Sequence, residues 1–248
     1  MRFDIITIFP DMFRALSDFG IPRRAIEQGQ LEIACWNPRE FTDDPHRMVD
    51  DRPYGGGPGM VMMAPPLHKT LQAVRMQQPD MPLVYVSPQG RRLDHAVVTR
   101  LAKRDGMILL AGRYAGVDER FIESYVDEEI SIGDYVLSGG EFAAMVLIDA
   151  LVRQLPGVLG NDESAGRDSF ASGLLDYPQY TRPEEYDGNA VPTVLTSGDH
   201  AVVERWRLKQ ALGRTWLKRP DLLEGLDEQA KELLNEFQQE YNNAEKSK

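Results

Sequence analysis

The alternation of hydrophobic and polar residues predicts a series of short strands and helices in the first half of the chain. Apolar or alternating runs predict strands over 3–9, 31–36, 83–86, 107–111 and 130–132. Helical spacing predicts helices over 66–77, 94–104 and 117–124, and a further helical stretch that begins at Asp11. Because short apolar strands that alternate with helices form mostly parallel sheets covered on both faces, we expect an α/β fold.

The pattern changes after Gly139. A strongly apolar helix is predicted over 142–155, and the glycine-rich polar stretch 160–173 follows it. Beyond that stretch lie a basic helical block and an acidic helix predicted over 227–241. We therefore expect a first domain over 1–159, an interdomain linker over 160–172 and a helical domain over 173–248.

Composition narrows the class of protein. Of the 248 residues, 42% are hydrophobic and 27% are charged, which excludes a disordered or fibrous chain. The single cysteine, Cys35, excludes an intrachain disulfide and a cysteine-based zinc site, and it fits a reducing compartment. No apolar run is long enough for a membrane helix, and the first residues do not resemble a secretory signal. We expect a cytoplasmic protein with no membrane segment.

Three glycine-containing turns follow three of the predicted strands, at 87–90, 112–116 and 131–140. Ligands of open α/β sheets bind beyond the carboxyl ends of the strands, and glycine lets the backbone approach a flat ligand such as adenine. A single glycine-containing turn after a strand is common and indicates no function, whereas three such turns together indicate a small-molecule site. The glycine run 55–59 lacks the Lys-Ser/Thr of a phosphate-binding loop, and the four scattered histidines predict no metal site.

Positive charge is concentrated at 200–220, where six lysines and arginines and one acid give a formal charge of +5 in a chain of net charge −11. The block is either an amphipathic helix with a solvated basic face or a surface that contacts the phosphates of a nucleic acid. Its tryptophans, Trp206 and Trp216, either anchor the helix or stack on bases. The candidate RNA-binding residues are Arg205, Arg207, Lys209 and Arg214.

Several longer motifs carry a family resemblance. They are DDRPYGGGPGM (50–60), SPQGRRLD (87–94), DEEISIGDYVLSGGE (127–141), PGVLG (156–160), DSF (168–170), YTRP (180–183) and RWRLKQALGRTWLKRP (205–220). In this order and spacing the chain closely resembles the bacterial tRNA (guanine-N1)-methyltransferase family, which belongs to the SPOUT class. The match runs nearly from end to end.

The resemblance implies a parallel sheet with a deep trefoil knot that binds S-adenosylmethionine, and a small helical C-terminal domain that grips tRNA. It also implies a homodimer whose active sites lie at the subunit interface. The substrate would be the guanosine at position 37 of tRNA, 3′ of the anticodon and preceded by another guanosine. The basic block falls where the RNA-gripping domain is expected.

The resemblance also implies roles for particular residues. Asp168 would be the general base that removes the proton from guanine N1, and Arg153 would orient it or stabilise charge on the purine oxygen. Local sequence alone does not single out Asp168, because acids in linkers are common. The cofactor-binding residues would be Tyr85, Val86, Ser87, Pro88, Gly90, Gly112, Tyr114, Ile132, Gly133, Asp134, Tyr135, Val136, Leu137, Gly139 and Gly140.

One departure from the family pattern bears on activity. The second turn of the family usually contains a glutamate where this chain has Ala115, so the pocket loses a carboxylate and a magnesium requirement is in doubt. Two alternatives remain open: a catalytically impaired homologue that binds RNA or cofactor, and a knotted methyltransferase that acts on another RNA site, such as a ribose hydroxyl. Asp168 and Arg153 favour methylation of a guanine, because a ribose has no purine oxygen to stabilise.

Overall fold

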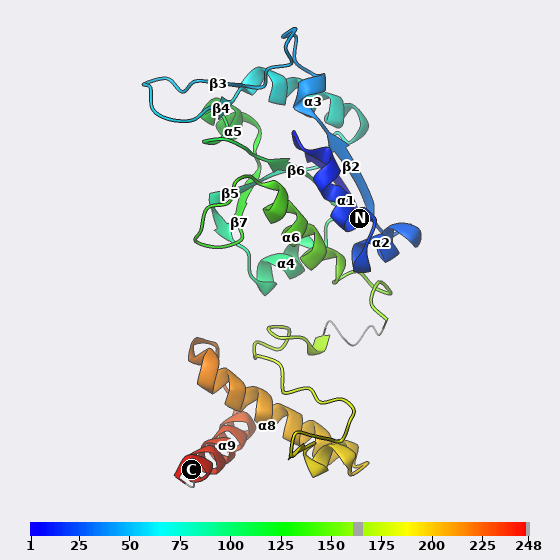
Figure 1. The fold of residues 1–248 in the computed structure, drawn as a ribbon, viewed down its shortest axis with the longest axis vertical. Helices are drawn as coiled ribbons and strands as arrows, with labels where there is room; N and C mark the ends of the chain where they lie inside the picture. Colours follow the sequence, from blue (N-terminus) through cyan, green and yellow to red (C-terminus); the bar gives the residue numbers. More distant parts are fainter. Residues whose placement is uncertain (161–165, 247–248) are drawn as a thin grey trace. The chain divides into compact units, whose positions relative to one another are not determined.

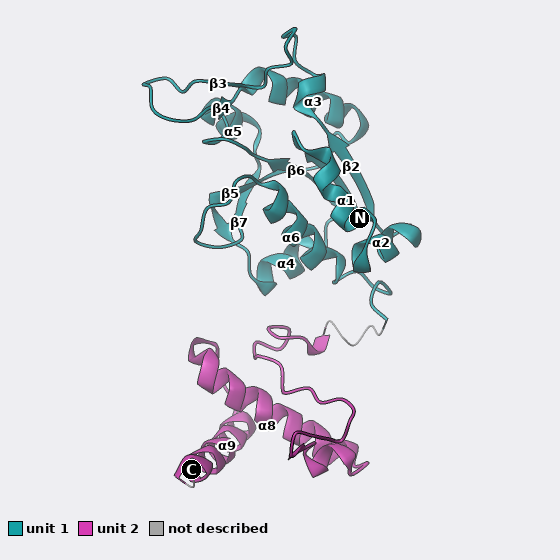
Figure 2. Cartoon of the chain, in the orientation of Figure 1, with its two compact units in different colours: residues 1–162 teal, residues 163–248 magenta. Residues whose placement is uncertain are grey.

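A computed structural model describes residues 1–160 and 166–246 of the chain. The chain divides into two compact units, residues 1–162 and 163–248 (Figure 2). The linker expected over 160–172 includes residues 161–165, which lie outside the described residues.

The first unit is built on a five-stranded sheet in the order β2-β1-β6-β5-β7, and every neighbouring pair is parallel (Figure 1). The strands are β1 (Arg2–Ile6), β2 (Glu32–Trp36), β5 (Leu83–Arg92), β6 (Gly106–Ala111) and β7 (Glu128–Ser131). The predicted α/β class with a parallel sheet is therefore confirmed. All six residues of β6 are buried, as expected for a strand covered on both faces.

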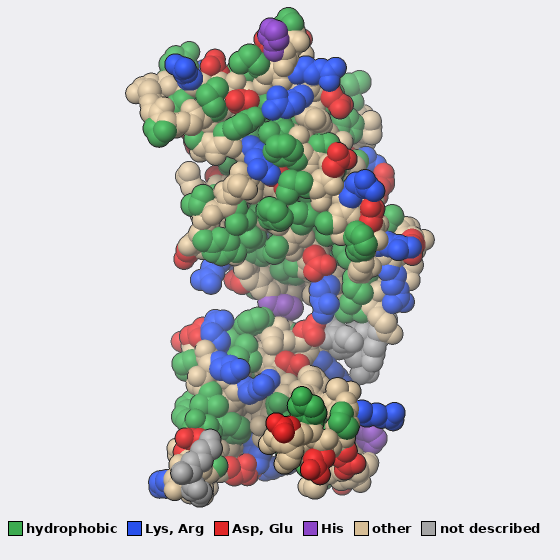
Figure 3. Space-filling model, viewed as in Figure 1, with side chains coloured by type: hydrophobic (Ala, Val, Ile, Leu, Met, Phe, Trp, Pro, Cys, Tyr) green, Lys and Arg blue, Asp and Glu red, His purple; other side chains and the backbone are tan. Residues whose placement is uncertain are grey.

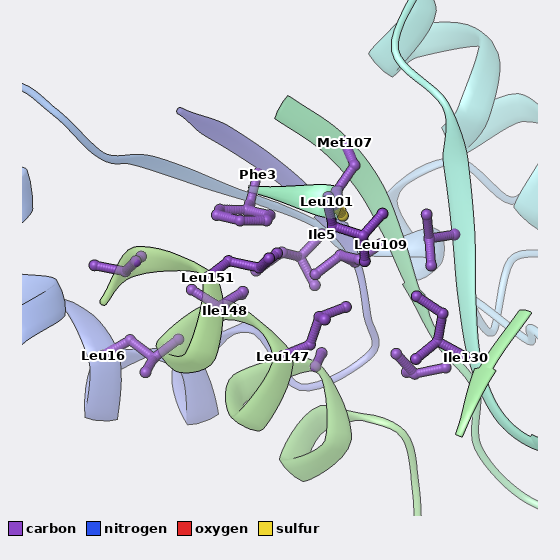
Figure 4. Packing of buried hydrophobic residues seen from close by; sticks show 14 of the residues in the cluster. Phe3, Ile5, Leu16, Leu101, Met107, Leu109, Ile130, Leu147, Ile148 and Leu151 are labelled. Carbon is purple, nitrogen blue, oxygen red and sulfur yellow. The ribbon is translucent and has the colours of Figure 1, made fainter. Parts of the chain in front are cut away.

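Helices cover both faces of this sheet. They are α1 (Arg14–Ser17), α2 (Gly20–Glu27), α3 (Ala64–Gln77), α4 (His95–Leu101), α5 (Glu119–Tyr125) and α6 (Glu141–Val152). Successive strand residues point to opposite faces, so Met107 and Leu109 join one hydrophobic cluster whereas Ile108 and Leu110 join the other. The first cluster packs the sheet against α1, α2, α4 and α6 (Figure 4), and the second packs it against α3 and α5.

The long, mostly polar segment 37–63, which joins β2 to α3 and for which the sequence pattern predicts no strand, contains some regular structure. Two short strands, β3 (Asp50–Asp51) and β4 (Val61–Met62), pair antiparallel within it. The 3-10 turns of the described chain are η1 (Pro10–Phe13), η2 (Pro38–Glu40), η3 (Thr193–Thr196) and η4 (Pro220–Leu222).

The second unit contains two long helices, α8 (His200–Lys218) and α9 (Glu228–Lys246), and a small hairpin of β8 (Glu185–Tyr186) and β9 (Asn189–Ala190). The helices pack closely at Gly213, where an added Cβ would lie 2.4 Å from the ring of Phe237. Asp199 caps α8 by accepting hydrogen bonds from the backbone N–H groups of Ala201 and Val202. No helix in the described part of the chain is long and apolar enough to cross a membrane.

Candidate functional site

A pocket of about 140 Å³ lies where the part of β5 around Val86 meets the loops that follow the carboxyl ends of β6 and β7. These strands are neighbours in the order β6-β5-β7, and parallel strands bring their carboxyl ends to the same edge of a sheet. The three glycine-containing turns therefore line one cavity, although they are separated by up to about fifty positions in the sequence. The lining is mostly apolar side chains and backbone.

The first of these loops differs from the expected turn. Strand β5 does not end at Val86 but continues to Arg92, and both Val86 and Arg91 are opposite Ile130 of β7. The residues between them form a bulge within the strand, and Ser87 and Pro88 of that bulge line the pocket. Gly90 does not line it. Its Cα packs on β7, where a Cβ would lie 2.3 Å from the backbone nitrogen of Ile130, so this glycine allows the two strands to approach.

The second and third loops are joined by backbone contacts. The Gly140 N–H donates a hydrogen bond of 2.8 Å to the Gly112 carbonyl, and Arg113 and Gly139 form a β-bridge. A Cβ on Gly140 would lie 2.8 Å from the Cα of Ala111 and 2.9 Å from the nitrogen of Gly112. The side chain of any larger residue at 140 would push the two loops apart.

The second loop is also tied to the segment that follows the long polar loop. The Ala115 N–H donates to the Met60 carbonyl at 2.8 Å, and the Met62 N–H donates to the Gly116 carbonyl at 2.9 Å. Loop 112–116 is thus held between residues 60–62 on one side and residues 139–140 on the other.

An ion pair between a partly exposed arginine and a fully buried carboxylate links the pocket lining to α6. Glu141, at the start of α6, is fully buried, and its carboxylate accepts hydrogen bonds from Arg113 Nε at 2.7 Å and Thr7 Oγ1 at 3.0 Å. The Arg113 guanidinium also donates to the Ser138 carbonyl and lies 4.5 Å from the ring centroid of Phe9. Arg113 is the one cation among the residues that line the pocket, and Glu141 compensates its charge.

Three tyrosines, Tyr85, Tyr114 and Tyr135, line the pocket, and the pKa values of the first two are shifted. Tyr85 is buried, and burial together with the charges of Glu129 and Glu119 raises the pKa of its phenol to about 12. Tyr114 has a left-handed backbone with φ of 64°, and its hydroxyl accepts a hydrogen bond from Arg39 at 3.1 Å. Burial and the neighbouring Asp50 carboxylate raise the pKa of Tyr114 as well, so both of these phenols are neutral at physiological pH.

The structure brings together most of the residues expected to hold a cofactor. All of them except Gly90 and Asp134 line the pocket. Sequence reasoning missed Arg113, Gly116, Ile130, Ser131 and Ala143, which also line it. Arg113 and Gly116 could have been predicted to line the pocket, because they belong to the same turn as Gly112. Glu141 gave no local signal, because a carboxylate at the start of an apolar helix is typical of an exposed first turn.

The two residues expected to carry the chemistry belong to different units. Arg153 is partly buried at the C-cap of α6 in the first unit. Asp168 is exposed in the second unit, where it lines a cavity of about 180 Å³ together with Tyr177 and Arg207.

Acidic side chains neutralise much of the basic block on α8. Arg205 makes two hydrogen bonds of 3.0 and 2.6 Å to Glu236 of α9, and Lys209 binds Glu240 of α9 at 2.7 Å. Arg207 pairs with its helix neighbour Glu204 at 2.6 Å and lies 5.0 Å from the ring centroid of Tyr177. Of the four candidate RNA-binding residues, Arg214 alone has no ion pair within the described residues.

The two tryptophans of α8 are partly buried against tyrosines. Trp206 lies 6.4 Å from Tyr180 and Trp216 lies 5.9 Å from Tyr241, measured between ring centroids. These contacts favour the anchoring role over stacking on bases. Over residues 1–160 and 166–246, no cluster of three or more His, Cys, Asp or Glu side chains is placed to hold a metal ion.

Comparison with known proteins identifies the family. The family model described as tRNA (Guanine-1)-methyltransferase TrmD matches residues 1–225. A tRNA (guanine-N(1)-)-methyltransferase of Nitrosospira multiformis is 59% identical over 96% of this chain and 97% of its own length. Proteins of the same name from Halorhodospira halophila and Serratia marcescens are 59% and 58% identical, over 95% and 97% of this chain and 90% and 96% of their own lengths. The chain therefore belongs to the tRNA (guanine-N1)-methyltransferase family.

Proposed function

We propose that this protein methylates N1 of the guanosine at position 37 of tRNA with S-adenosylmethionine as the methyl donor. The observation that carries the proposal is the match of residues 1–225 to the family, combined with a pocket at the strand ends that the family motifs line. The guanosine would follow another guanosine, as the family resemblance implies.

The chemistry of the pocket fits this methyl donor. Backbone amides and carbonyls of three glycine-containing loops surround an apolar cavity, which suits a flat adenine. A positively charged sulfonium would be repelled by Arg113 if that guanidinium were uncompensated, and Glu141 holds the compensating charge at 2.7 Å. The residues proposed to hold the donor are those predicted from the sequence that line the pocket, and Gly90 supports them by allowing β5 to pack closely on β7.

The donor, when bound, supplies an electrophilic methyl carbon. The residues of the chain must make guanine N1 nucleophilic, because N1 carries a proton at neutral pH. Asp168 would accept that proton, and the guanidinium of Arg153 would stabilise the negative charge that develops on O6. An aspartate is a weak base toward this proton, so the stabilisation of O6 is essential to the mechanism.

Replacement of Asp168 by Asn tests the proposed base. The amide cannot accept the N1 proton, so we expect turnover to fall by roughly 10²- to 10⁴-fold. Cofactor affinity, measured by calorimetry, should stay unchanged because Asp168 does not line the pocket at the strand ends. Unchanged turnover in Asp168→Asn would remove Asp168 from the mechanism.

The order of β5, β6 and β7 and the ties of loop 112–116 support the proposal of a trefoil knot. This loop is bonded on one side to residues 60–62 and on the other to residues 139–140. We also propose the domain roles that the resemblance implies. Residues 1–159 form the methyltransferase domain, residues 160–172 form the linker and residues 173–248 form the tRNA-binding domain.

The exposed face of α6 supports the proposal of a homodimer. Phe142 and Val146 are spaced four residues apart on this helix and are about half exposed. Figure 3 shows the apolar surface on the face of the first unit that carries α6. Apolar patches of this kind mark protein contacts, so a second copy of the chain would cover this one. Light scattering should give the mass of a dimer for the chain and of a monomer for Phe142→Asp.

Transfer of a radiolabelled methyl group onto unmodified tRNA tests the function as a whole. Incorporation should require guanosine at position 37 and should disappear when that base is adenosine. Incorporation that survives the change would favour methylation at another RNA site. Normal cofactor binding without any incorporation would favour an impaired homologue, which the missing carboxylate at Ala115 motivates.

A further inference from the structure

Six cations on and just after α8 give the second unit its basic block, and four of them are engaged with acids. The pairs are Arg205–Glu236, Arg207–Glu204, Lys209–Glu240 and Arg219–Asp221, with nitrogen–oxygen distances of 2.6 or 2.7 Å. A cation that already pairs with a carboxylate gains less from a phosphate, because it must exchange one anion for another. These four residues therefore contribute less to an RNA interface than their number suggests.

Arg214 and Lys218 are the exceptions. Within residues 1–160 and 166–246 neither side chain has an ion pair or a side-chain hydrogen bond. They are four residues apart on α8, so they lie on the same face of the helix. Both line one cavity of about 390 Å³, which is larger than the pocket at the strand ends.

The other walls of this cavity come from the segment that begins just after Asp168. Ser169 Oγ accepts a hydrogen bond of 2.9 Å from the backbone N–H of Asp176, which leaves the hydroxyl proton to donate elsewhere. Asp176 is the one carboxylate on the wall, and it accepts hydrogen bonds from the Tyr177 N–H at 2.8 Å and from Gln179 Nε2 at 3.1 Å. Two cations against one occupied carboxylate leave the cavity with a net positive charge.

We propose that Arg214 and Lys218, with the Ser169 hydroxyl, form a binding site for one phosphodiester group of the RNA backbone. The guanidinium suits the paired oxygens of a phosphate, the ammonium adds a second charge and the hydroxyl adds a donor. Because Ser169 directly follows Asp168, the phosphate held here belongs to a nucleotide close to the reacting guanosine. The inference rests on the proposed function, since it assigns a contact to the same tRNA.

The salt dependence of tRNA binding by the full chain tests this site. Each phosphate contact contributes about 0.7 to 0.9 to the slope of log affinity against log salt concentration. Because both side chains bind the same phosphate, we expect the double variant Arg214→Gln, Lys218→Gln to reduce the slope by about one contact and each single variant by a fraction of one. Near 100 mM salt the double variant should weaken binding by roughly five- to tenfold.

Lys231→Gln is the matched control. It removes the same charge from the second unit, but Lys231 lies on α9, pairs with Glu228 and does not line the cavity. Its slope should equal that of the unchanged protein. Thermal melting followed by circular dichroism verifies folding, and Lys218 is exposed near the end of its helix, so Lys218→Gln provides the test without disturbing packing.

An unchanged slope in the double variant would overturn the site, as would an equal loss in Lys231→Gln. If the unchanged protein still methylates tRNA in that case, the proposed function stands and only the phosphate site is wrong. If the unchanged protein transfers no methyl group to any tRNA, the proposed function itself fails.

Discussion

The pair of Arg113 with the fully buried Glu141 gives the most quantitative prediction about the site. In Arg113→Met the Glu141 carboxylate stays fully buried and keeps the Thr7 hydroxyl, at 3.0 Å, as its remaining side-chain partner. Methionine retains most of the apolar length of arginine, so the main loss is the countercharge. The change therefore tests whether this pair holds the second loop against the start of α6.

The expected cost follows from burial. Removal of one partner of a buried ion pair costs about 3 to 5 kcal/mol, because the remaining charge is left without compensation in a poor solvent. The pair of Arg23 and Glu27 has the same 2.7 Å distance, but its side chains are 56% and 58% exposed. Removal of that exposed i,i+4 pair should cost no more than about 0.5 kcal/mol. Because the nitrogen–oxygen distance is the same in both pairs, the difference between their unfolding free-energy losses measures the effect of burial.

Urea unfolding provides the assay. Trp36 is the one tryptophan of the first unit, so its fluorescence in a Trp206→Phe, Trp216→Phe background reports on that unit. Arg113→Met should lose several kcal/mol of unfolding free energy, and Arg113→Met with Glu141→Met should recover part of it. If Arg113→Met costs no more than Arg23→Gln, the pair does not support the pocket as described.

Three further changes probe the pocket. Gly140→Ala places a Cβ within 2.9 Å of two backbone atoms, so it should weaken cofactor binding in calorimetry by the equivalent of about 1 to 3 kcal/mol, whereas Gly160→Ala, with no atom closer than 3.9 Å, should not. Ala115→Glu restores a carboxylate to the pocket lining, and we expect methyl transfer to rise by roughly tenfold or more, the effect of one charged hydrogen bond; an unchanged rate would exclude that role. The fold favours the neutral phenol of Tyr85, because its pKa is raised from 10.0 to about 12. The contribution of this phenol to the free energy of unfolding is complete below pH 10 and is lost as the pH rises toward 12. Tyr85→Phe should abolish that pH-dependent loss in urea titrations.

The sequence predicted the parallel sheet well, because buried strands such as Met107–Ala111 are continuous apolar runs. It also placed the glycine turns that line the pocket, since the turns follow those runs directly. It placed the end of β5 wrongly. The pairing of Arg91 and Arg92 with β7 depends on backbone contacts between Gly90 and Ile130, which no local pattern records.

The contacts of the basic block were also beyond local reasoning. The charge count identified α8 correctly as the basic element, but Glu236 and Glu240 lie 31 residues from the cations that they neutralise. Only the packing of α9 on α8 distinguishes the paired Arg205 and Lys209 from Arg214. Likewise, a carboxylate at the start of an apolar helix is typical of an exposed first turn, so the sequence does not predict the burial of Glu141. Arg113, the partner that allows this burial, lies in a different loop.

The chemical identity of the product tests the central claim most directly. Unmodified tRNA carrying guanosines at positions 36 and 37 would be incubated with the protein and S-adenosylmethionine, digested to nucleosides and separated by mass spectrometry against standards. We expect 1-methylguanosine, located at position 37 by partial digestion before the final hydrolysis. A methyl group on a ribose, on another base or on another ring atom of guanine would contradict the account.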